Sequence, residues 1–162
     1  MKRSLLGLLI LLMVSSCNWE RPTEFSEGVL NDELITISGN STTLNQVLEA
    51  NKGKDILIDI WATWCKDCMV GFPDVRDLQK QFPDVQFIFL SVDRNANTWK
   101  RGVEKYQLKG EHYYIASGWD GVTGDFVRLN WIPRYMVIDK NGKIKLFKAT
   151  KATDKRIKDA LL

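Results

Sequence analysis

The chain has 162 residues, of which 44% are hydrophobic and 27% are charged. These values are typical of one globular domain, and they exclude a disordered chain, a collagen-like chain and a protein that crosses a membrane many times. The formal net charge is +3, and so small a charge gives no electrostatic footprint for nucleic acid. We therefore expect no nucleic-acid partner. Three cysteines are too few for a small fold that is stabilised mainly by disulfides.

The N-terminus has the features of an export signal. Basic residues at its start precede an apolar run over 5–14, which is too short to cross a membrane and fits the hydrophobic region of a signal peptide. Residues 14–17 (Val-Ser-Ser-Cys) then resemble the lipobox of bacterial lipoproteins. In that family the cysteine thiol receives diacylglycerol and a peptidase cleaves directly before it, so the resemblance implies lipidation at Cys17. The alternative is an ordinary secretory signal, which would leave Cys17 as an exposed thiol in an oxidising compartment.

The domain organisation follows from this signal. We expect a lipoprotein signal peptide over 1–16, a lipidated N-terminus and tether over 17–31, and a folded domain over 32–162. The tether is polar, although Phe25 is apolar enough to dock on the domain. An acylated cysteine would anchor the domain to a membrane surface without spanning it. We therefore expect an exported protein that faces the periplasm or another extracytoplasmic space.

Predicted strands and helices alternate along the domain. Thr43 and Gln46 form a capping-box pattern that begins a helix, and the apolar runs over 56–62 and 85–92 are typical of central strands buried on both faces. Residues 141–142 (Asn-Gly) predict a two-residue hairpin turn. The predicted strands cover 33–38, 56–62, 85–92, 113–116, 134–139 and 143–149, and the predicted helices cover 44–50, 65–82 with an interruption at Pro73, 97–106, 122–129 and 153–162. This order predicts an α/β sandwich with a mixed sheet.

Two cysteines three residues apart, Cys65 and Cys68, form the chemical centre of the sequence. Both would lie on one face of the first turn of a helix. Cys65 would be exposed near the helix N-terminus, where free N–H groups and the helix dipole favour a thiolate, and Cys68 would be shielded one turn inside. Zinc is one alternative, but it usually needs four ligands and the chain has a single histidine. A purely structural disulfide is another, but closing so short a loop would add little stability.

The surroundings of this pair resemble a known family. Residues 58–68 (Ile-Asp-Ile-Trp-Ala-Thr-Trp-Cys-Lys-Asp-Cys) resemble the active-site strand and turn of the thioredoxin superfamily, and they are most similar to its membrane-tethered TlpA/ResA-like members. Pro73 matches the family's kink proline, and Ile132-Pro133 matches its cis-proline. The resemblance implies a thioredoxin-like three-layer sandwich. It also implies a thiol–disulfide oxidoreductase that uses no cofactor.

The resemblance assigns a role to each site residue. Cys65 would be the nucleophile that forms a mixed disulfide with the substrate, and Cys68 would resolve it. Asp59 matches the family's buried carboxylate; its pKa should be raised in an apolar strand, and it would accept the proton of Cys68. The alternative is an aspartate satisfied by backbone or water. Pro133 would face the disulfide, whereas a trans proline at the start of an edge strand is the alternative.

Four further residues would contact the substrate. Trp64 would form part of the contact surface, and the Ile132 backbone could pair with an extended substrate chain. Lys66 and Asp67 stand between the cysteines, where thioredoxin has Gly-Pro, and this departure should shift the redox potential, usually towards a more oxidising value. Gly71 stands where ResA-like reductases carry a Glu, which weakens an assignment to apocytochrome c.

Two other functions on the same fold fit less well. A Cu(I) chaperone would use two thiolates, but that family has a CxxxC motif and a histidine further downstream. A peroxidase of the peroxiredoxin type needs a threonine where this chain has Ala62. We therefore expect a monomer that exchanges disulfides with protein substrates. Because its compartment has no glutathione poise, we expect electrons to come from a membrane-embedded donor.

Overall fold

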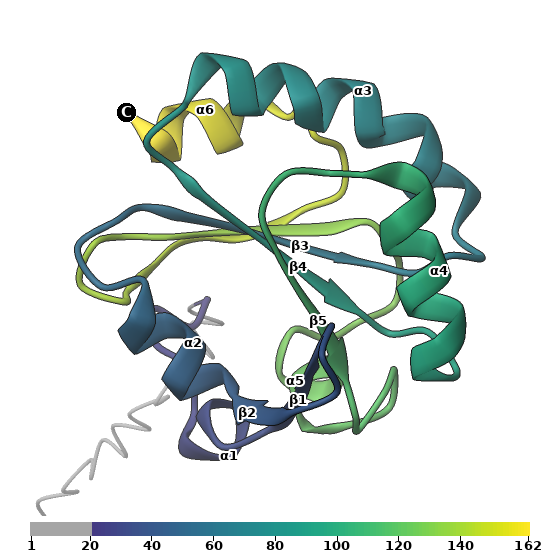
Figure 1. Cartoon of the computed structure of the whole chain (residues 1–162). Coiled ribbons are helices and arrows are strands. Elements are labelled where there is room, and N and C mark those ends of the chain that lie inside the picture. Colours follow the sequence, from purple (N-terminus) through teal and green to yellow (C-terminus); the bar gives the residue numbers. More distant parts are fainter. Residues whose placement is uncertain (1–20) are drawn as a thin grey trace, which may run out of the picture.

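The computed structural model describes residues 21–162 (Figure 1). The predicted signal peptide over 1–16 and the predicted lipidation site, Cys17, lie outside the described residues. Among the described residues, no helix has the length and apolar character needed to cross a bilayer.

One seven-stranded mixed sheet organises the domain. Its strand order is β2-β1-β5-β4-β3-β6-β7. Strand β3 pairs in parallel with β4, which pairs in parallel with β5, and the other neighbours are antiparallel. The strands are β1 (Glu33–Thr36), β2 (Ser41–Thr43), β3 (Ile56–Trp61), β4 (Gln86–Ser91), β5 (Glu111–Ile115), β6 (Arg134–Ile138) and β7 (Ile144–Ala149). The predicted mixed sheet is confirmed.

Helices cover both faces of this sheet. The steps from β3 to β4 and from β4 to β5 move in the same direction, so right-handed crossovers place α3 and α4 on one face, where α6 joins them (Figure 1). The remaining helices α1, α2 and α5 lie on the other face. The helices are α1 (Glu27–Leu30), α2 (Leu44–Ala50), α3 (Lys66–Gln81), α4 (Ala96–Tyr106), α5 (Val122–Phe126) and α6 (Lys155–Leu161). The three-layer thioredoxin-like sandwich is therefore confirmed.

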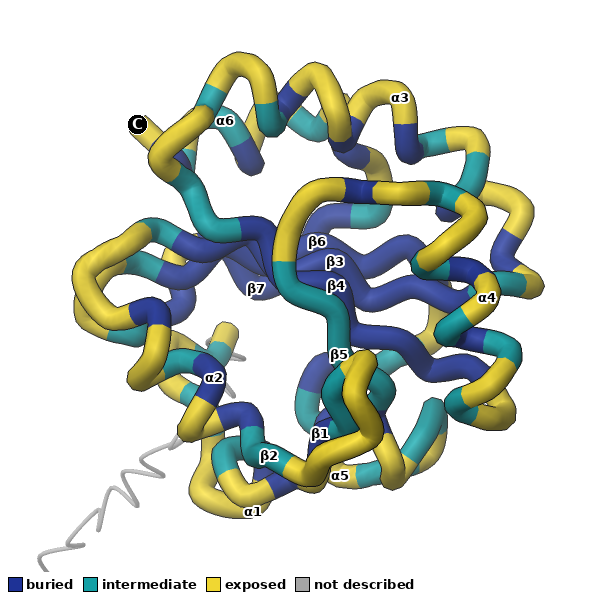
Figure 2. Tube along the Cα trace, viewed as in Figure 1, coloured by how far each residue is buried: buried dark blue, intermediate teal, exposed yellow. Residues whose placement is uncertain are grey.

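The core lies along the central strands. All residues of β3 and β6 are buried, as the dark blue central tubes in Figure 2 show. On the face covered by α3 and α4, the Trp61 indole packs edge-on against Phe72 and Tyr106, with ring centroids 5.6 and 6.2 Å apart. This packing fixes the end of β3, from which the cysteine motif follows.

Several local features differ from their predictions. Helix α3 is continuous over Lys66–Gln81, so the predicted interruption at Pro73 is wrong. Proline removes only one N–H, and the buried Phe72 and Val75 hold the turns on both sides of it against the core. The sequence patterns did not predict the four-residue α1 or the three-residue β2. The capping box at Thr43, by contrast, is confirmed.

The described end of the predicted tether packs on the domain. Val29 in α1 is fully buried, and the Phe25 ring lies 5.6 Å from that of Phe126. The Ile144 N–H also donates to the Thr23 carbonyl at 2.8 Å. The expected docking of Phe25 is therefore observed, and residues 23–30 hold the chain against the face opposite α3.

Candidate active site

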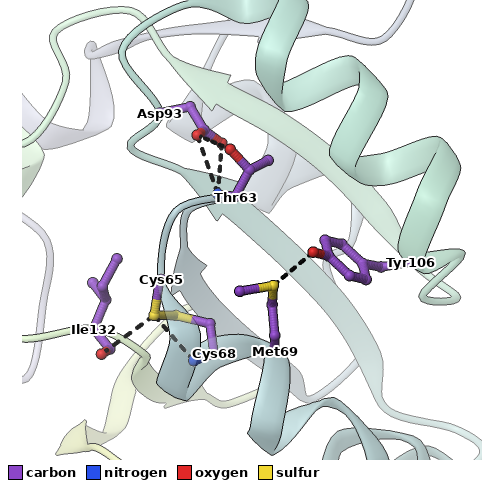
Figure 3. Close-up of a disulfide and its surroundings, with 7 residues drawn as sticks. All are labelled: Thr63, Cys65, Cys68, Met69, Asp93, Tyr106 and Ile132. Carbon is purple, nitrogen blue, oxygen red and sulfur yellow. Dashed lines mark hydrogen bonds between the residues drawn. A yellow bond between two sulfur atoms is a disulfide. The ribbon is translucent and has the colours of Figure 1, made fainter.

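The two cysteines lie where β3 passes into α3. Cys65 is the N-cap of α3 and forms a disulfide with Cys68 (Figure 3). The Cys68 N–H points at Cys65 Sγ at 3.0 Å, so a backbone donor of the first helical turn faces the sulfur. Such a donor at a helix N-terminus stabilises a thiolate.

The expected exposure of Cys65 is wrong. Its exposed fraction is 5%, and that of Cys68 is 0%. The loop before β6 covers Cys65, because the Ile132 carbonyl oxygen lies 3.6 Å from its Sγ. Contact with a substrate therefore depends on the opening at the beginning of α3 that leaves Cys65 5% exposed, because Cys68 has no exposed surface.

Asp93 fixes the turn that carries the cysteines. Its carboxylate accepts hydrogen bonds from the Thr63 N–H at 3.1 Å and from the Thr63 hydroxyl at 2.6 Å (Figure 3). It also accepts one from the Ser91 hydroxyl at 2.8 Å. Asp93 is itself buried. Sequence reasoning missed this residue. Its signal is an acidic residue just after a buried parallel strand, at the same sheet edge as the CxxC turn.

The loop facing the disulfide is held by a buried arginine. The Ile132–Pro133 peptide bond is cis, and Arg134 follows it with no exposed surface. The Arg134 guanidinium donates to the Val127 carbonyl and, at 3.1 Å, to Asn130 Oδ1. These bonds tie the segment after α5 to the start of β6. Sequence reasoning missed Arg134, because nothing in its local pattern indicates that the side chain points inward.

An aromatic rim surrounds the opening. Trp64 and Trp131 are 54% and 56% exposed, and the Trp64 and Trp119 rings lie 6.0 Å apart. These three indoles and Cys65 line a pocket of about 380 Å³, which Lys66 and Asp67 also border. A cavity of this size admits the side chain of a polypeptide substrate.

A buried carboxyl group lies beneath α3. Asp59 is in the middle of β3 and is 1% exposed, and neither of its oxygens has a hydrogen-bond partner in the described part of the chain. Burial raises the pKa of Asp59 to about 8. Asp59 is on the same face as Trp61, because side chains two residues apart in a strand point to the same side. That face is the one covered by α3, which carries Cys68.

Comparisons with known proteins agree with this architecture. The family model described as thioredoxin-like matches residues 53–144. The chain belongs to the thioredoxin-like family. Its match to thioredoxin-like protein YneN of Bacillus subtilis is 25% identical and covers 99% of this chain and 98% of that protein. A solved structure named as a thiol-disulfide oxidoreductase from Bacteroides vulgatus is 32% identical, with a TM-score of 0.66 over 80% of this chain and 83% of that one.

Other relatives bear on activity and location. The thiol-disulfide oxidoreductase ResA of Bacillus cereus is 30% identical over 57% of this chain, and the match spans about half of that protein's length (53%). A prokaryotic membrane lipoprotein lipid attachment site matches residues 1–18. This thioredoxin-like protein is therefore a thiol–disulfide oxidoreductase, and it is a membrane-anchored lipoprotein of an extracytoplasmic space.

Proposed function

We propose that this oxidoreductase works as a reductant of protein disulfides, with Cys65 as nucleophile and Cys68 as resolving thiol. The observation that carries the direction is the pair of contacts at Cys65 Sγ, one amide donor at 3.0 Å and one carbonyl oxygen at 3.6 Å. The amide favours a thiolate and the carbonyl dipole opposes it. The charges of Lys66 and Asp67 have opposite signs and offset each other in the same way. Strongly oxidising thiol–disulfide oxidoreductases have a strongly stabilised reduced form. The opposing contacts at Cys65 do not stabilise its thiolate strongly, so they argue against a strong oxidant.

The reaction proceeds in two exchanges. The Cys65 thiolate attacks one sulfur of the substrate disulfide, forms a mixed disulfide and releases the first substrate thiolate. Cys68 then gives its proton to the Asp59 carboxylate and attacks Cys65 Sγ, which releases the second substrate thiolate. Two electrons have passed to the substrate, and the Cys65–Cys68 disulfide has formed. The raised pKa of Asp59, about 8, suits this role because it lies close to that of a thiol.

Substrate binding is assigned to the rim. Trp64 supplies apolar contact area at the pocket, and Lys66 and Asp67 offer charges of both signs beside it. The Ile132 backbone would pair with an extended substrate chain next to Pro133. A substrate disulfide in a flexible or unfolded segment can adopt that extended form, so such segments are the substrates that we propose.

The electron donor is assigned to the membrane. Arg21, the first described residue, is four residues from Cys17, and four peptide units reach at most about 14 Å. An acyl anchor at Cys17 thus keeps the domain beside the bilayer surface, where a membrane-embedded thiol donor can reach it. We propose that the protein acts there as a monomer.

A trapping experiment tests the direction and the cysteine roles together. The reduced mature lipoprotein in detergent is mixed with a disulfide-containing unfolded protein. The wild type should release free substrate thiols, and Cys68→Ser should accumulate a mixed disulfide through Cys65. Cys65→Ser is the matched control and should form none. The proposal is wrong if reduced wild-type protein leaves the substrate oxidised, or if Cys65→Ser traps substrate as well as Cys68→Ser does.

A further inference from the structure

Two buried polar side chains stand next to each other without partners. Asp59 on β3 and Tyr135 on β6 are register partners in the antiparallel pair, so their side chains leave the same face of the sheet. Their exposed fractions are 1% and 0%. Neither Asp59 oxygen nor the Tyr135 hydroxyl has a hydrogen-bond partner within residues 21–162. Side chains directly opposite in such a pair have Cβ atoms about 5 Å apart.

Tyr135 also borders a pocket. A Cβ atom built on Gly71 of α3 would stand 3.5 Å from Tyr135 Oη, so the glycine leaves open space over the hydroxyl. Gly71 and Tyr135 both line a pocket of about 400 Å³, together with Asp67, Asp74, Trp131 and Pro133. This pocket shares Asp67 and Trp131 with the pocket beside Cys65.

Buried polar atoms without partners are rare, and the ordinary remedy is an ordered water where the site is polar and has room. Here the pocket provides room beside Tyr135, and the hydroxyl and the carboxyl group provide polar partners. Asp59 needs such a connection, because a carboxyl group that takes a proton in every cycle must return it to solvent. Its own exposed surface is nearly zero.

We propose that the Tyr135 hydroxyl, with water from the pocket beside Gly71, carries protons between Asp59 and solvent. In the reductive direction Asp59 holds the proton taken from Cys68. A water between the two side chains passes that proton to the tyrosine oxygen, while the tyrosine's own O–H proton passes to the pocket water. One proton leaves for solvent, the tyrosine stays neutral and the Asp59 carboxylate is restored. Tyr135 is thus a positioning residue for proton transfer, which touches neither sulfur nor substrate.

The charges around Tyr135 keep it in the required form. Burial, followed by the negative charges of Asp59 and Asp74, raises the pKa of Tyr135, so that its hydroxyl remains protonated and can both donate and accept. The charged groups that face it are Asp59 from β3 and Asp74 from α3. Asp67 and Lys151 border the same pocket.

The inference rests on the proposed role of Asp59, and the test separates the two. Thiol–disulfide exchange is measured on the full mature protein with dithiothreitol and glutathione disulfide, because exchange with small molecules needs the Cys68 proton in either direction. Tyr135→Phe removes only the hydroxyl. We expect exchange to slow about tenfold, with an altered pH profile and solvent isotope effect. Tyr113→Phe, which removes a half-buried hydroxyl on β5, is the matched control and should change neither.

The double variant Asp59→Asn/Tyr135→Phe decides between a shared proton route and separate effects. If both residues serve one route, the double variant should be as slow as Asp59→Asn alone. If the losses multiply, or if Tyr135→Phe has the wild-type rate and pH profile, the relay is wrong. Gly71→Ala gives a second test because it narrows the space over the hydroxyl, and it should slow exchange while leaving the thermal unfolding midpoint nearly unchanged. If Asp59→Asn itself leaves exchange unchanged, the proposed base fails, and the relay fails with it.

Discussion

The rim and the floor of the cysteine site differ in their exposure to solvent. The rim tryptophans Trp64 and Trp131, with the charged Lys66 and Asp67 beside them, are exposed to solvent around the N-terminal end of α3. The floor, comprising Asp59, Cys68 and Tyr135, is buried where α3 meets the sheet, and its residues have exposed fractions of 0–1%. In Figure 2 the outer side of α3 is mostly yellow, while β3 and β6 beneath it are dark blue.

This difference separates recognition from chemistry. A charge on the rim is screened by water, so a single contact there contributes little. A charge on the floor is poorly solvated because its side chain is buried, so its protonation state changes both stability and rate. Substitutions at the floor should therefore alter the chemical step and the pH dependence, and substitutions at the rim should alter substrate affinity.

The largest expected effect is on stability. The pKa of Asp59 is raised from 3.8 to about 8 in the folded protein, so the folded state binds a proton that the unfolded state loses. Stability from this group is complete below pH 4 and is lost as the pH rises towards 8. At 1.36 kcal/mol per pKa unit, Asp59→Asn should be more stable than the wild type by roughly 4 kcal/mol at pH 7, and the difference should grow further up to about pH 8. Denaturant unfolding of the oxidised protein from pH 5 to 9 measures this difference.

Two comparisons make that result specific. Asp77→Asn, at an exposed aspartate of α3, is the control and should not gain this stability. Burial lowers the pKa of His112, which acts with the opposite sign because its stability contribution grows as the pH rises. His112 is common to both proteins, so the difference between Asp59→Asn and wild type isolates Asp59. If the stability of Asp59→Asn and that of the wild type depend equally on pH, the Asp59 carboxyl group is well solvated.

The next effect is on rate. Asp59→Asn removes the proton acceptor of the resolving step, so breakdown of the mixed disulfide at pH 7 should slow about 100-fold. Stopped-flow measurement of substrate thiol release, with the first attack by Cys65 followed separately, locates the loss. A slower first attack with normal breakdown would place the carboxyl group in another step.

A moderate effect on stability is expected at Asp93, which holds the turn that carries the cysteines. Asp93→Ala leaves the Thr63 N–H and the hydroxyls of Thr63 and Ser91 without their acceptor, and unfolding should require about 2 kcal/mol less free energy. Asp93→Asn keeps one acceptor oxygen and should lose less. Unfolding curves of the three proteins test this order, and equal stabilities would show that Thr63 does not depend on the carboxylate.

The smallest effect is expected at the rim. Trp131→Ala removes one wall of the pocket beside Cys65, so KM for a protein disulfide should rise about fivefold while kcat stays within twofold. Val70→Ala, at an exposed apolar residue of α3, is the control and should change KM less. A fall in kcat with constant KM would contradict the separation of rim from floor.

Local sequence signals predicted the elements that depend on local chemistry. The capping box at Thr43 and the apolar run of β3 are visible in a few adjacent residues, and both are confirmed. The Asn-Gly pair marks the position of the hairpin, but the predicted two-residue turn is wrong, because the Asp139 N–H donates to the Lys143 carbonyl and three residues lie between them. The resemblance on residues 58–68 placed the cysteine pair and Asp59 correctly in the fold. Elements of three or four residues, such as α1 and β2, are too short to show a period.

The remaining parts depend on contacts between distant segments. Asp93, which follows β4, accepts a hydrogen bond from Thr63, which follows the neighbouring parallel strand β3. Arg134 donates to the Val127 carbonyl in the segment after α5. The low exposure of Cys65 arises from Ile132, which is 67 residues away in the chain. Tyr135 next to Asp59 becomes visible only once the register of β3 and β6 is known.

The reduction potential of the Cys65–Cys68 pair tests the central claim most directly. Redox equilibration of the mature protein against glutathione or dithiothreitol buffers, followed by thiol counting, gives the value. Thioredoxin lies near −270 mV and the oxidant DsbA near −120 mV, each as an approximate reference. We predict a potential at or below about −250 mV, which fits a reductant supplied by a membrane donor. A potential above about −180 mV would contradict this account and make the protein an oxidant or an isomerase.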